Sequence, residues 1–472
     1  MIEKLRNDVV HAKNHVQEAI NLAHQLQPAL NAVVTFVDPT QQLEHLEDVK
    51  TGLMAGVPIA LKDNVNTKGI RTTASSKILD NYIPVYNAHI VDLLTKQGAI
   101  CIAKASMDEL AMGGSNLTAA TGPVSNPWDL SRIAGGSSGG SAALVASGVV
   151  PFAVGSDTGD SVRKPAGFCG IVGVKPTYGR ISRYGIIPYS SSLDHVGYFT
   201  RNVKDACIGL EVLAGRDDRD MTSSLKEVPP YSELLSESLK GKKIGIIKNV
   251  TDSIQNETTM NLFNELIDKM KNEGAEIKEI NFDNNLLRAI LPTYYMIANC
   301  EATANHSNLD GIRFGVQAEG DSTEDVMINS RTEGFGLQVR KRFITGSYGL
   351  FVENQEKLFR KAQRVRRLIV EAMQEALQDV DCLIAPASST IAPKIKGEKI
   401  DELMDEYLVA ENHMVMGNFS GYPSMTLPMG FDQGCPLGVN ITCKAFDEVT
   451  MFNIGAGIEK CTGLKDLVAE VK

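Results

Sequence analysis

The feature that most constrains the fold of this chain is a segment from Gly135 to Gly179 that is dense in small residues. Eleven glycines and six serines fall within it, about a quarter glycine against an average of roughly 7% in proteins. Such density is typical of flexible linkers. Here, however, apolar runs at 142–150, 151–154 and 168–174 interrupt the glycines. We therefore expect glycine where the backbone closely approaches other backbone or a ligand, or adopts positive φ.

Three kinds of catalytic or binding site use segments of this composition. A phosphate-binding loop requires Gly-Lys-Ser/Thr at the start of a helix, and the segment lacks that triplet. A nucleophile elbow, G-x-S-x-G, matches residues 135–139, but an α/β-hydrolase also needs an acid and then a late histidine. The downstream histidines, His195, His306 and His413, have no distinguishing context. The sequence leaves this alternative open.

The third kind of site pairs serine with lysine. A serine hydroxyl is a weak nucleophile until a neighbouring group takes its proton. Lysine can take it only where burial lowers the lysine pKa enough to leave the amine neutral. Lys62 directly follows the apolar run 57–61, which makes it a candidate for such a base. A lysine at the end of a buried strand can equally extend its ammonium to solvent, so spacing alone does not decide its role.

Strand-like and helix-like stretches alternate along the rest of the chain. Residues 1–30 carry one apolar stripe and predict a single amphipathic helix, which packs on the body of the chain or docks a partner subunit. The pattern also predicts helices at 88–97, 256–273 and 355–378, and strands at 32–37, 56–61, 99–103, 243–247, 275–280 and 381–385. This alternation predicts an α/β fold, a mixed β-sheet core flanked by α-helices. Without an internal repeat or a long linker, we expect a single large domain over 1–472.

Composition restricts the class of protein. The chain has 47 Lys+Arg against 57 Asp+Glu, a net charge of -10, which disfavours nucleic-acid binding along its whole surface. Its eight cysteines are scattered without a CxxC pair, which predicts reduced thiols and no zinc site. His11 and His15 lie four residues apart but lack the glutamate of a metalloprotease motif. The first fifteen residues contain two acids and no apolar core, which argues against a signal peptide, and the longest apolar run, 142–154, is too short to span a membrane. We therefore expect a cytoplasmic protein.

Several motifs together make the sequence similar to a known family. It resembles the amidase signature family in GVPIALKDN (56–64), GGSSGGSAA (135–143), GSDTGDSVRKPAGFCG (155–170) and KPTYGRISRYG (175–185). It resembles more narrowly the A subunits of tRNA-dependent amidotransferases in SSLDHVG (191–197), LDGIRFG (309–315), TEGFGLQVRKR (332–342) and KAQRVR (361–366). The resemblance covers nearly the whole chain and implies the amidase signature fold, with 135–179 as its catalytic segment.

The resemblance implies a Lys–Ser–Ser triad and no metal ion. Lys62 would be the base, Ser137 would follow a cis peptide bond and relay the proton, and Ser161 would be the acylated nucleophile. Backbone N–H groups beside the nucleophile would form the oxyanion hole, contributed by Thr158, Gly159, Asp160 and Ser161.

For the A subunits the resemblance implies glutamine as substrate. Arg342 would bind the α-carboxylate through its planar guanidinium, Glu411 would bind the α-amino group, and Tyr294 would lie nearby. The sequence leaves open that Arg342 and Glu411 form surface ion pairs and that Tyr294 is a core residue.

Three residues depart from the usual pattern of the family. Asp160 stands where glycine is common, Lys164 where glutamine is frequent, and Glu411 where many relatives have aspartate. Aspartate tolerates the left-handed backbone region and keeps its N–H, so the oxyanion hole need not be lost. We expect Lys164 to pair with Asp160 and cancel its charge. The departures leave the reaction class unchanged.

The resemblance thus implies an ammonia-supplying glutaminase subunit that acts through a Ser161 acyl-enzyme. Its partners would be subunits B and C of a heterotrimer, which would hold the misacylated tRNA and use ATP and Mg²⁺, whereas this chain would need no cofactor. The product would be Gln-tRNA(Gln) made from Glu-tRNA(Gln), or Asn-tRNA(Asn) made from Asp-tRNA(Asn). Two alternatives remain: a stand-alone amidase acting on small amides, and a catalytically weak scaffold subunit, which Asp160 suggests.

Overall fold

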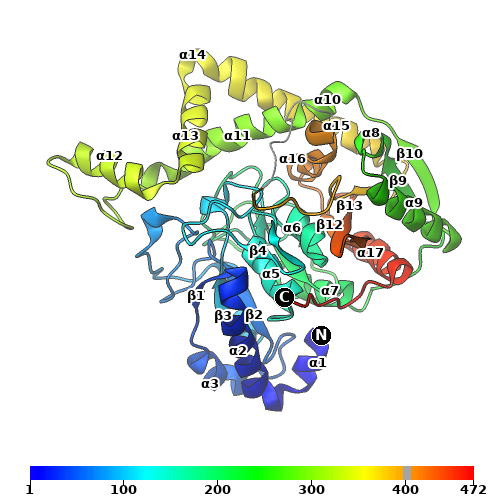
Figure 1. Ribbon diagram of the computed structural model, residues 1–472, viewed down its shortest axis with the longest axis horizontal. Coiled ribbons are helices and arrows are strands. Elements are labelled where there is room, and N and C mark those ends of the chain that lie inside the picture. Colours follow the sequence, from blue (N-terminus) through cyan, green and yellow to red (C-terminus); the bar gives the residue numbers. More distant parts are fainter. Residues whose placement is uncertain (397–405, 472) are drawn as a thin grey trace.

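The computed structural model describes residues 1–396 and 406–471. Its centre is an eleven-stranded sheet in the order β1-β3-β2-β6-β8-β7-β12-β13-β11-β9-β10, and β4 and β5 form a separate pair (Figure 1). The strands are β1 Val33–Phe36, β2 Pro58–Lys62, β3 Ile100–Ala105, β4 Ser125–Asn126, β5 Asp129–Ile133, β6 Phe152–Asp157, β7 Val172–Lys175, β8 His195–Thr200, β9 Lys243–Ile247, β10 Glu276–Ile280, β11 Cys382–Pro386, β12 Ser424–Asp432 and β13 Cys435–Cys443.

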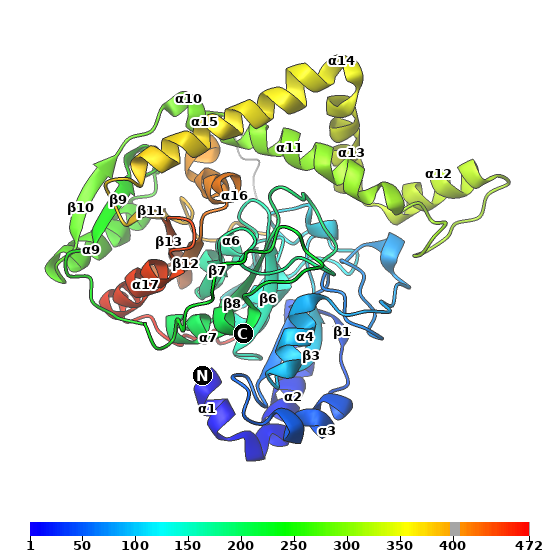
Figure 2. The ribbon, with the colours of Figure 1, turned by 180° about the vertical axis from the view of Figure 1, so that it is seen from behind.

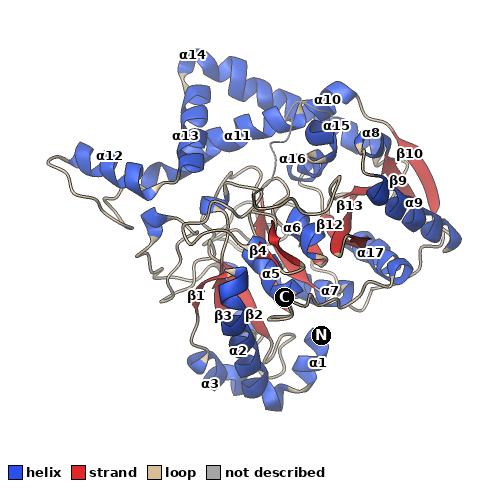
Figure 3. Ribbon diagram, in the orientation of Figure 1, coloured by secondary structure: helices blue, strands red, loops and turns tan. Residues whose placement is uncertain are grey.

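Helices cover the sheet on both sides (Figure 3). They are α1 Ile2–Asn7, α2 Ala12–Leu30, α3 Thr40–Val49, α4 His89–Lys96, α5 Gly139–Ala146, α6 Arg163–Cys169, α7 Val203–Leu213, α8 Lys248–Ser253, α9 Glu257–Asn272, α10 Asn284–Arg288, α11 Ile290–Asn305, α12 Thr323–Gly334, α13 Leu337–Leu350, α14 Val352–Gln355, α15 Lys361–Ala376, α16 Met416–Ser420 and α17 Glu448–Thr462. Among the described residues, none of these helices is long and apolar enough to cross a membrane.

The sheet is mixed, as the sequence predicts. Strand β2 is parallel to its neighbours β3 and β6, and β9 is parallel to β10 and β11, whereas the other neighbours are antiparallel. Every residue of β2, β6, β7, β8, β11 and β13 is buried. Strands buried on both faces are continuous apolar runs without polar alternation. The expected α/β fold with a mixed sheet flanked by helices is confirmed.

The prediction of one helix over 1–30 is wrong. Helix α1 ends at Asn7, a short 3₁₀ turn follows, and α2 begins at Ala12. The break follows from two different docking sites. The N-terminal ammonium and the Ile2 N–H both bind the Asp205 carboxylate of α7, at 2.8 Å and 3.1 Å, whereas α2 packs beside β3 and α5. This first segment therefore packs on the body of its own chain.

Helix α5, in the glycine-rich segment, is buried along its whole length. A Cβ added to Gly140 would lie 2.5 Å from the Ser106 carbonyl oxygen and 2.7 Å from that of Ala32. Gly140 therefore lets the start of α5 touch the backbone at the end of β3, as the prediction of close backbone approach requires. Gly135 has φ +80°, the other conformation predicted for these glycines.

A layer of long helices lies beside the carboxyl ends of several strands. Helix α11 packs against both α13 and α15, and α12 extends outward from this group in both views (Figures 1 and 2). The expected helix 355–378 is present as α14 and α15 joined by a π-helical turn at Glu356–Arg360. The layer contributes side chains to the site described below, which the sheet and its loops complete.

Replacement of Gly140 by alanine should destabilise the fold. Alanine favours helices, but here its methyl group would collide with two backbone carbonyls that cannot move independently. We expect a loss of about 1–3 kcal/mol in the free energy of unfolding, measured by urea denaturation. Gly114, whose added Cβ would meet nothing within 4 Å, is the matched control, and Gly114→Ala should change stability by less than about 0.5 kcal/mol. Equal effects of the two variants would contradict this account of the close approach.

Candidate active site

Lys62, the last residue of β2, is fully buried. Its Nζ lies 2.8 Å from Ser137 Oγ, 2.7 Å from Ser138 Oγ and 2.9 Å from Ser156 Oγ. Ser137 and Ser138 precede α5, and Ser156 belongs to β6, the parallel neighbour of β2. The strand order therefore brings one amine and three hydroxyls together inside the protein.

Burial lowers the pKa of Lys62 to about 7, although the carboxylates of Asp108, Asp157 and Asp194 oppose the shift. Removal of an ammonium from water penalises its charged form. A large fraction of Lys62 is therefore a neutral amine near pH 7. The alternative of a lysine with its ammonium in solvent is wrong, because the whole side chain is enclosed.

Ser137 follows a cis peptide bond, Gly136–Ser137, as expected. Its side chain is fully buried, and its carbonyl accepts a hydrogen bond from the Asp108 N–H at 3.1 Å. The carboxylate of Asp108 accepts the Asn116 N–H at 2.8 Å, so the loop after β3 supports the serine segment. Lys62 and Ser137 are thus in direct contact.

Ser161 lies on the turn between β6 and α6. The Ser138 N–H donates to its carbonyl at 3.3 Å, which joins this turn to the segment that contacts Lys62. Within the described residues, the Ser161 hydroxyl and the backbone N–H groups of Gly159, Asp160 and Ser161 have no hydrogen-bond partner. The turn therefore presents one hydroxyl and several unused donors, the groups that an oxyanion hole requires.

A buried ion pair fixes this turn. The Asp157 carboxylate accepts the Val162 N–H at 3.0 Å and binds Arg163 Nη2 at 2.9 Å. Asn418 of α16 bridges the pair, with Nδ2 2.9 Å from Asp157 and Oδ1 2.6 Å from Arg163. Burial alone would raise the pKa of Asp157, but the Arg163 charge more than offsets it and lowers that pKa. The pair is therefore ionised and holds the loop before Ser161 in place.

Thr158 and Gly159 are packed from two sides. Thr158 Oγ1 donates to Asp194 at 2.7 Å, and a Cβ on Gly159 would lie 3.0 Å from Tyr294 Cζ on α11. Only glycine fits at position 159 without moving that ring. Tyr294 therefore lies beside the Ser161 turn, and its expected place in a glutamine site stays a prediction.

Asp160 differs from its surroundings. It is the one residue between positions 149 and 177 that is not buried. Its φ is not positive, so the ability of aspartate to adopt the left-handed backbone region is not used at this position. Burial of the surrounding turn raises the pKa of the carboxyl to about 6.

The expected pairing of Lys164 with Asp160 is wrong. Lys164 Nζ lies 2.7 Å from Glu411 Oε2, and it also donates to the Glu411 carbonyl at 3.1 Å. Lys164 lies one helical turn after Asp160, and its Nζ lies 6.0 Å from the centre of the Phe168 ring. The charge of Lys164 is therefore balanced by Glu411.

Arg342 of α13 is buried among tyrosines, so the alternative of a surface ion pair is wrong. Its guanidinium donates to the Tyr189 hydroxyl and lies 5.1 Å from the ring of Tyr295. Burial opposes its charge, but the neighbouring hydroxyls, Tyr189 first, raise the pKa of Arg342 overall. Its buried Nε has no hydrogen-bond partner within the described residues. Arg342 thus has a donor free for an anion.

Glu411 has both carboxylate oxygens engaged. One binds Lys164, and the other accepts the Ser389 N–H and hydroxyl, both at 2.6 Å. Burial alone would raise the pKa of Glu411, but Lys164 and Ser389 together lower it. That Glu411 binds the amino group of a substrate stays a prediction.

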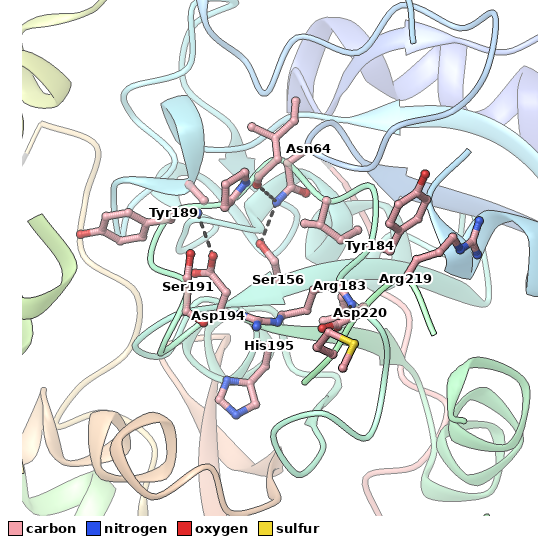
Figure 4. Close-up of a pocket in the computed structure, with 16 residues that line it drawn as sticks. Asn64, Ser156, Arg183, Tyr184, Tyr189, Ser191, Asp194, His195, Arg219 and Asp220 are labelled. Carbon is pink, nitrogen blue, oxygen red and sulfur yellow. Dashed lines mark hydrogen bonds between the residues drawn. The ribbon is translucent and has the colours of Figure 1, made fainter. Parts of the chain in front are cut away.

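A cavity of about 260 Å³ adjoins the lysine–serine cluster (Figure 4). The Asn64 amide points to the Ser156 hydroxyl, which it meets at 3.1 Å, and Asp194 accepts the Tyr189 N–H at 2.8 Å. Asn64, Ser156 and Asp194 support the cluster but were not predicted from the sequence. All three lie inside the family motifs: Asn64 in GVPIALKDN, Ser156 in GSDTGDSVRKPAGFCG and Asp194 in SSLDHVG. Motif membership was the available signal.

The alternative of a nucleophile elbow with a late histidine is wrong. His195, His306 and His413 are all buried, and burial lowers the pKa of each. The Nδ1 atoms of His195 and His413 lie 2.7 Å from backbone carbonyls, and Nε2 of all three has no partner within the described chain. Among the residues described, no cluster of three or more His, Cys, Asp or Glu could hold a metal ion.

A family model described as Amidase matches residues 14–452. The chain belongs to the amidase family. The resemblance stated from its motifs is confirmed, and this membership agrees with the buried lysine beside paired serines.

Curated relatives within the amidase family are similar over nearly the whole chain. The A subunit of the glutamyl-tRNA(Gln) amidotransferase of Prochlorococcus marinus (strain NATL2A) is 41% identical over 97% of this chain and 96% of its own length. Its counterpart in Microcystis aeruginosa (strain NIES-843 / IAM M-2473) is 44% identical over 87% and 84%.

Solved structures of the family agree. The crystal structure of the A subunit of glutamyl-tRNA(Gln) amidotransferase from Thermotoga maritima matches with a TM-score of 0.82 at 34% identity, covering 98% of this chain and 95% of its own. A peptide amidase from Stenotrophomonas maltophilia matches with a TM-score of 0.81 at 26% identity, covering 96% and 94%. The amidase fold expected from the sequence is therefore confirmed.

Removal of the Asp157 charge should strongly destabilise the protein. Asp157→Asn would leave Arg163 buried without its counter-ion, which costs about 3–5 kcal/mol. The matched control is Asp268→Asn, because Asp268 forms an exposed pair with Lys271 and should cost less than about 0.5 kcal/mol. Urea unfolding of both variants measures the difference. Similar midpoints would show that the Asp157–Arg163 pair does not hold the turn.

Proposed function

We propose that this member of the amidase family is the glutamine-hydrolysing subunit of a glutamyl-tRNA(Gln) amidotransferase. The relatives that carry this name match nearly the whole chain at about 40% identity. The observation that carries the chemistry is the fully buried Lys62, 2.8 Å from Ser137 and linked through Ser138 to the Ser161 turn.

Acylation would use Lys62, Ser137 and Ser161 as a proton relay. Ser161 Oγ would attack the side-chain amide carbon of glutamine, and its proton would pass to Ser137 as Ser137 gives its own to neutral Lys62. The oxyanion would be stabilised by the unused N–H groups of Gly159, Asp160 and Ser161, with Thr158 beside them. The proton would then return to the amide nitrogen, the C–N bond would break, and ammonia would leave.

Deacylation would run the same relay in reverse. Water would lose a proton to the relay as it attacks the acyl-enzyme carbonyl. The relay would return that proton to Ser161 Oγ as the ester bond breaks and glutamate leaves. The free Nε of Arg342 supports binding of the glutamine α-carboxylate, because a guanidinium matches a planar carboxylate. Tyr294, packed on Gly159, would form one wall of the glutamine site.

Partner subunits would complete the reaction in the cytoplasm. Ammonia would pass to subunits B and C of a heterotrimer, which would hold the misacylated tRNA, Glu-tRNA(Gln) or Asp-tRNA(Asn), and supply the ATP and Mg²⁺ site. The net charge of -10 agrees with a chain that does not itself bind the tRNA. A stand-alone amidase would instead be fully active without these partners, and a scaffold subunit would form no acyl-enzyme.

Ser161→Ala should lower ammonia release from glutamine about 10⁴-fold or more, because it removes the proposed nucleophile. The assay is ammonia release by the complex purified with its partner subunits, with and without ATP and misacylated tRNA. Recovery of the complex by pull-down checks that assembly is intact. Full activity of Ser161→Ala would overturn the assignment. Activity of the isolated chain that is indifferent to tRNA and ATP would favour the stand-alone amidase.

The rate at saturating glutamine should rise with pH through about 7. Lys62 accepts a proton only as the neutral amine, and its pKa is about 7, so each pH unit below that value should lower kcat about tenfold. Lys62→Met should remove activity at every pH. Lys271→Met changes an exposed lysine on α9 and should keep both rate and profile. A kcat that stays flat from about pH 5.5 to 8 would exclude Lys62 as the base.

A further inference from the structure

Asp160 is partly exposed within an otherwise buried part of the chain. Asp160 immediately precedes Ser161, and it alone between positions 149 and 177 retains solvent exposure. Within the described residues, no ion pair and no side-chain hydrogen bond involve its carboxylate. An unpaired carboxylate beside a nucleophile is a ready acceptor for a cation.

Glu411, the acid expected to bind an amino group, is already neutralised. Lys164 and Ser389 occupy its two carboxylate oxygens with bonds of 2.6–2.7 Å. With its charge balanced by Lys164 and three donors already bound, Glu411 offers a substrate ammonium less attraction than an unpaired carboxylate. The Lys164–Glu411 pair therefore contributes no net charge to the site.

Asp160 lies near the elements that form the glutamine site. Asp160 follows Gly159, which Tyr294 contacts, and the charges of Lys164 and Glu411 both act on the Asp160 pKa. Tyr294 is also an electrostatic neighbour of Arg342. Asp157, Asp194 and Glu411 already have hydrogen-bonding partners. Within the described residues, the anion of Asp160 has none, and the cation of Arg342 keeps one unpaired donor, its Nε. These two charges complement an α-amino acid zwitterion.

We propose that Asp160, and not Glu411, binds the α-ammonium group of the substrate. This inference rests on the proposed glutaminase function and deepens it. In this chain, the acid that binds the amino group is the residue before the nucleophile. Glu411 instead has a structural role as the partner of Lys164. The site would still prefer an α-amino acid amide, with Asp160 in place of Glu411 as the group that binds the ammonium.

The test compares glutamine with 4-carbamoylbutanoate, which has the same amide and carboxylate but no amino group. Asp160→Asn keeps the size of the side chain and removes its charge. We expect it to raise the KM for glutamine about 10- to 100-fold, the range for a lost charged hydrogen bond, and to leave the KM for 4-carbamoylbutanoate within about twofold. A preserved kcat on 4-carbamoylbutanoate would show that the oxyanion hole is intact. Asp268→Asn, on the exposed face of α9, is the matched control.

The double variant Lys164→Gln/Glu411→Gln removes both members of the ion pair without leaving a buried charge. It should keep the preference for glutamine over 4-carbamoylbutanoate. Loss of that preference in the double variant, with its retention in Asp160→Asn, would assign the ammonium to Glu411 and overturn the proposal. Equal weakening of both substrates by Asp160→Asn would also overturn it, because a structural role of Asp160 does not depend on the amino group.

Calorimetry separates this inference from the proposed function. Titration of both compounds into Ser161→Ala measures binding without turnover. If the wild-type complex does not hydrolyse glutamine, the proposed function fails. A binding preference for glutamine that Asp160→Asn abolishes in the Ser161→Ala background still supports the inference, whereas equal or absent binding of the two compounds overturns it.

Discussion

The burial of Lys62 is the constraint on which the rest of the site depends. An ammonium enclosed at the end of a central strand is expensive unless it loses its proton or finds acceptors. The structure does both, since burial lowers the lysine pKa to about 7 and three serine hydroxyls surround Nζ. Those hydroxyls come from the residues just before α5 and from β6. The parallel pairing of β2 with β6 and the close approach of α5 at Gly140 are therefore both needed to bring the hydroxyls to Lys62 Nζ.

Two ion pairs hold the elements of the site together, and the charges within them are not available to a substrate. Asp157 and Arg163 fix the Ser161 turn and connect it to α16 through Asn418. Lys164 and Glu411 connect α6 to the segment that precedes α16. Each pair is neutral as a unit, and Asp160 and Arg342 are the charged side chains proposed to face the substrate. Loss of one member would place an uncompensated charge near the nucleophile.

Local patterns predicted much of the fold. The expected strands at 32–37, 56–61, 99–103, 243–247, 275–280 and 381–385 are β1, β2, β3, β9, β10 and β11. Strands β8, β12 and β13 were not predicted, because glycine, proline or polar residues interrupt their apolar runs, whereas the equally buried β2, β3 and β11 are largely apolar. The break at 8–11 was missed because the apolar stripe is continuous there, whereas docking to Asp205, far along the chain, decides the direction of α1.

The sequence by itself determined the family, the presence of a lysine and serines in its motifs, and the alternation of strands and helices, because each is a property of short segments. Only the tertiary structure decided which charges are paired. Lys164 lies four residues from Asp160 but pairs with Glu411, 247 positions away. Arg342 is likewise buried among tyrosines of α11 and the loop before β8. A buried charge needs a partner, and the packing of distant segments, not their separation in the sequence, determines which partner lies within reach.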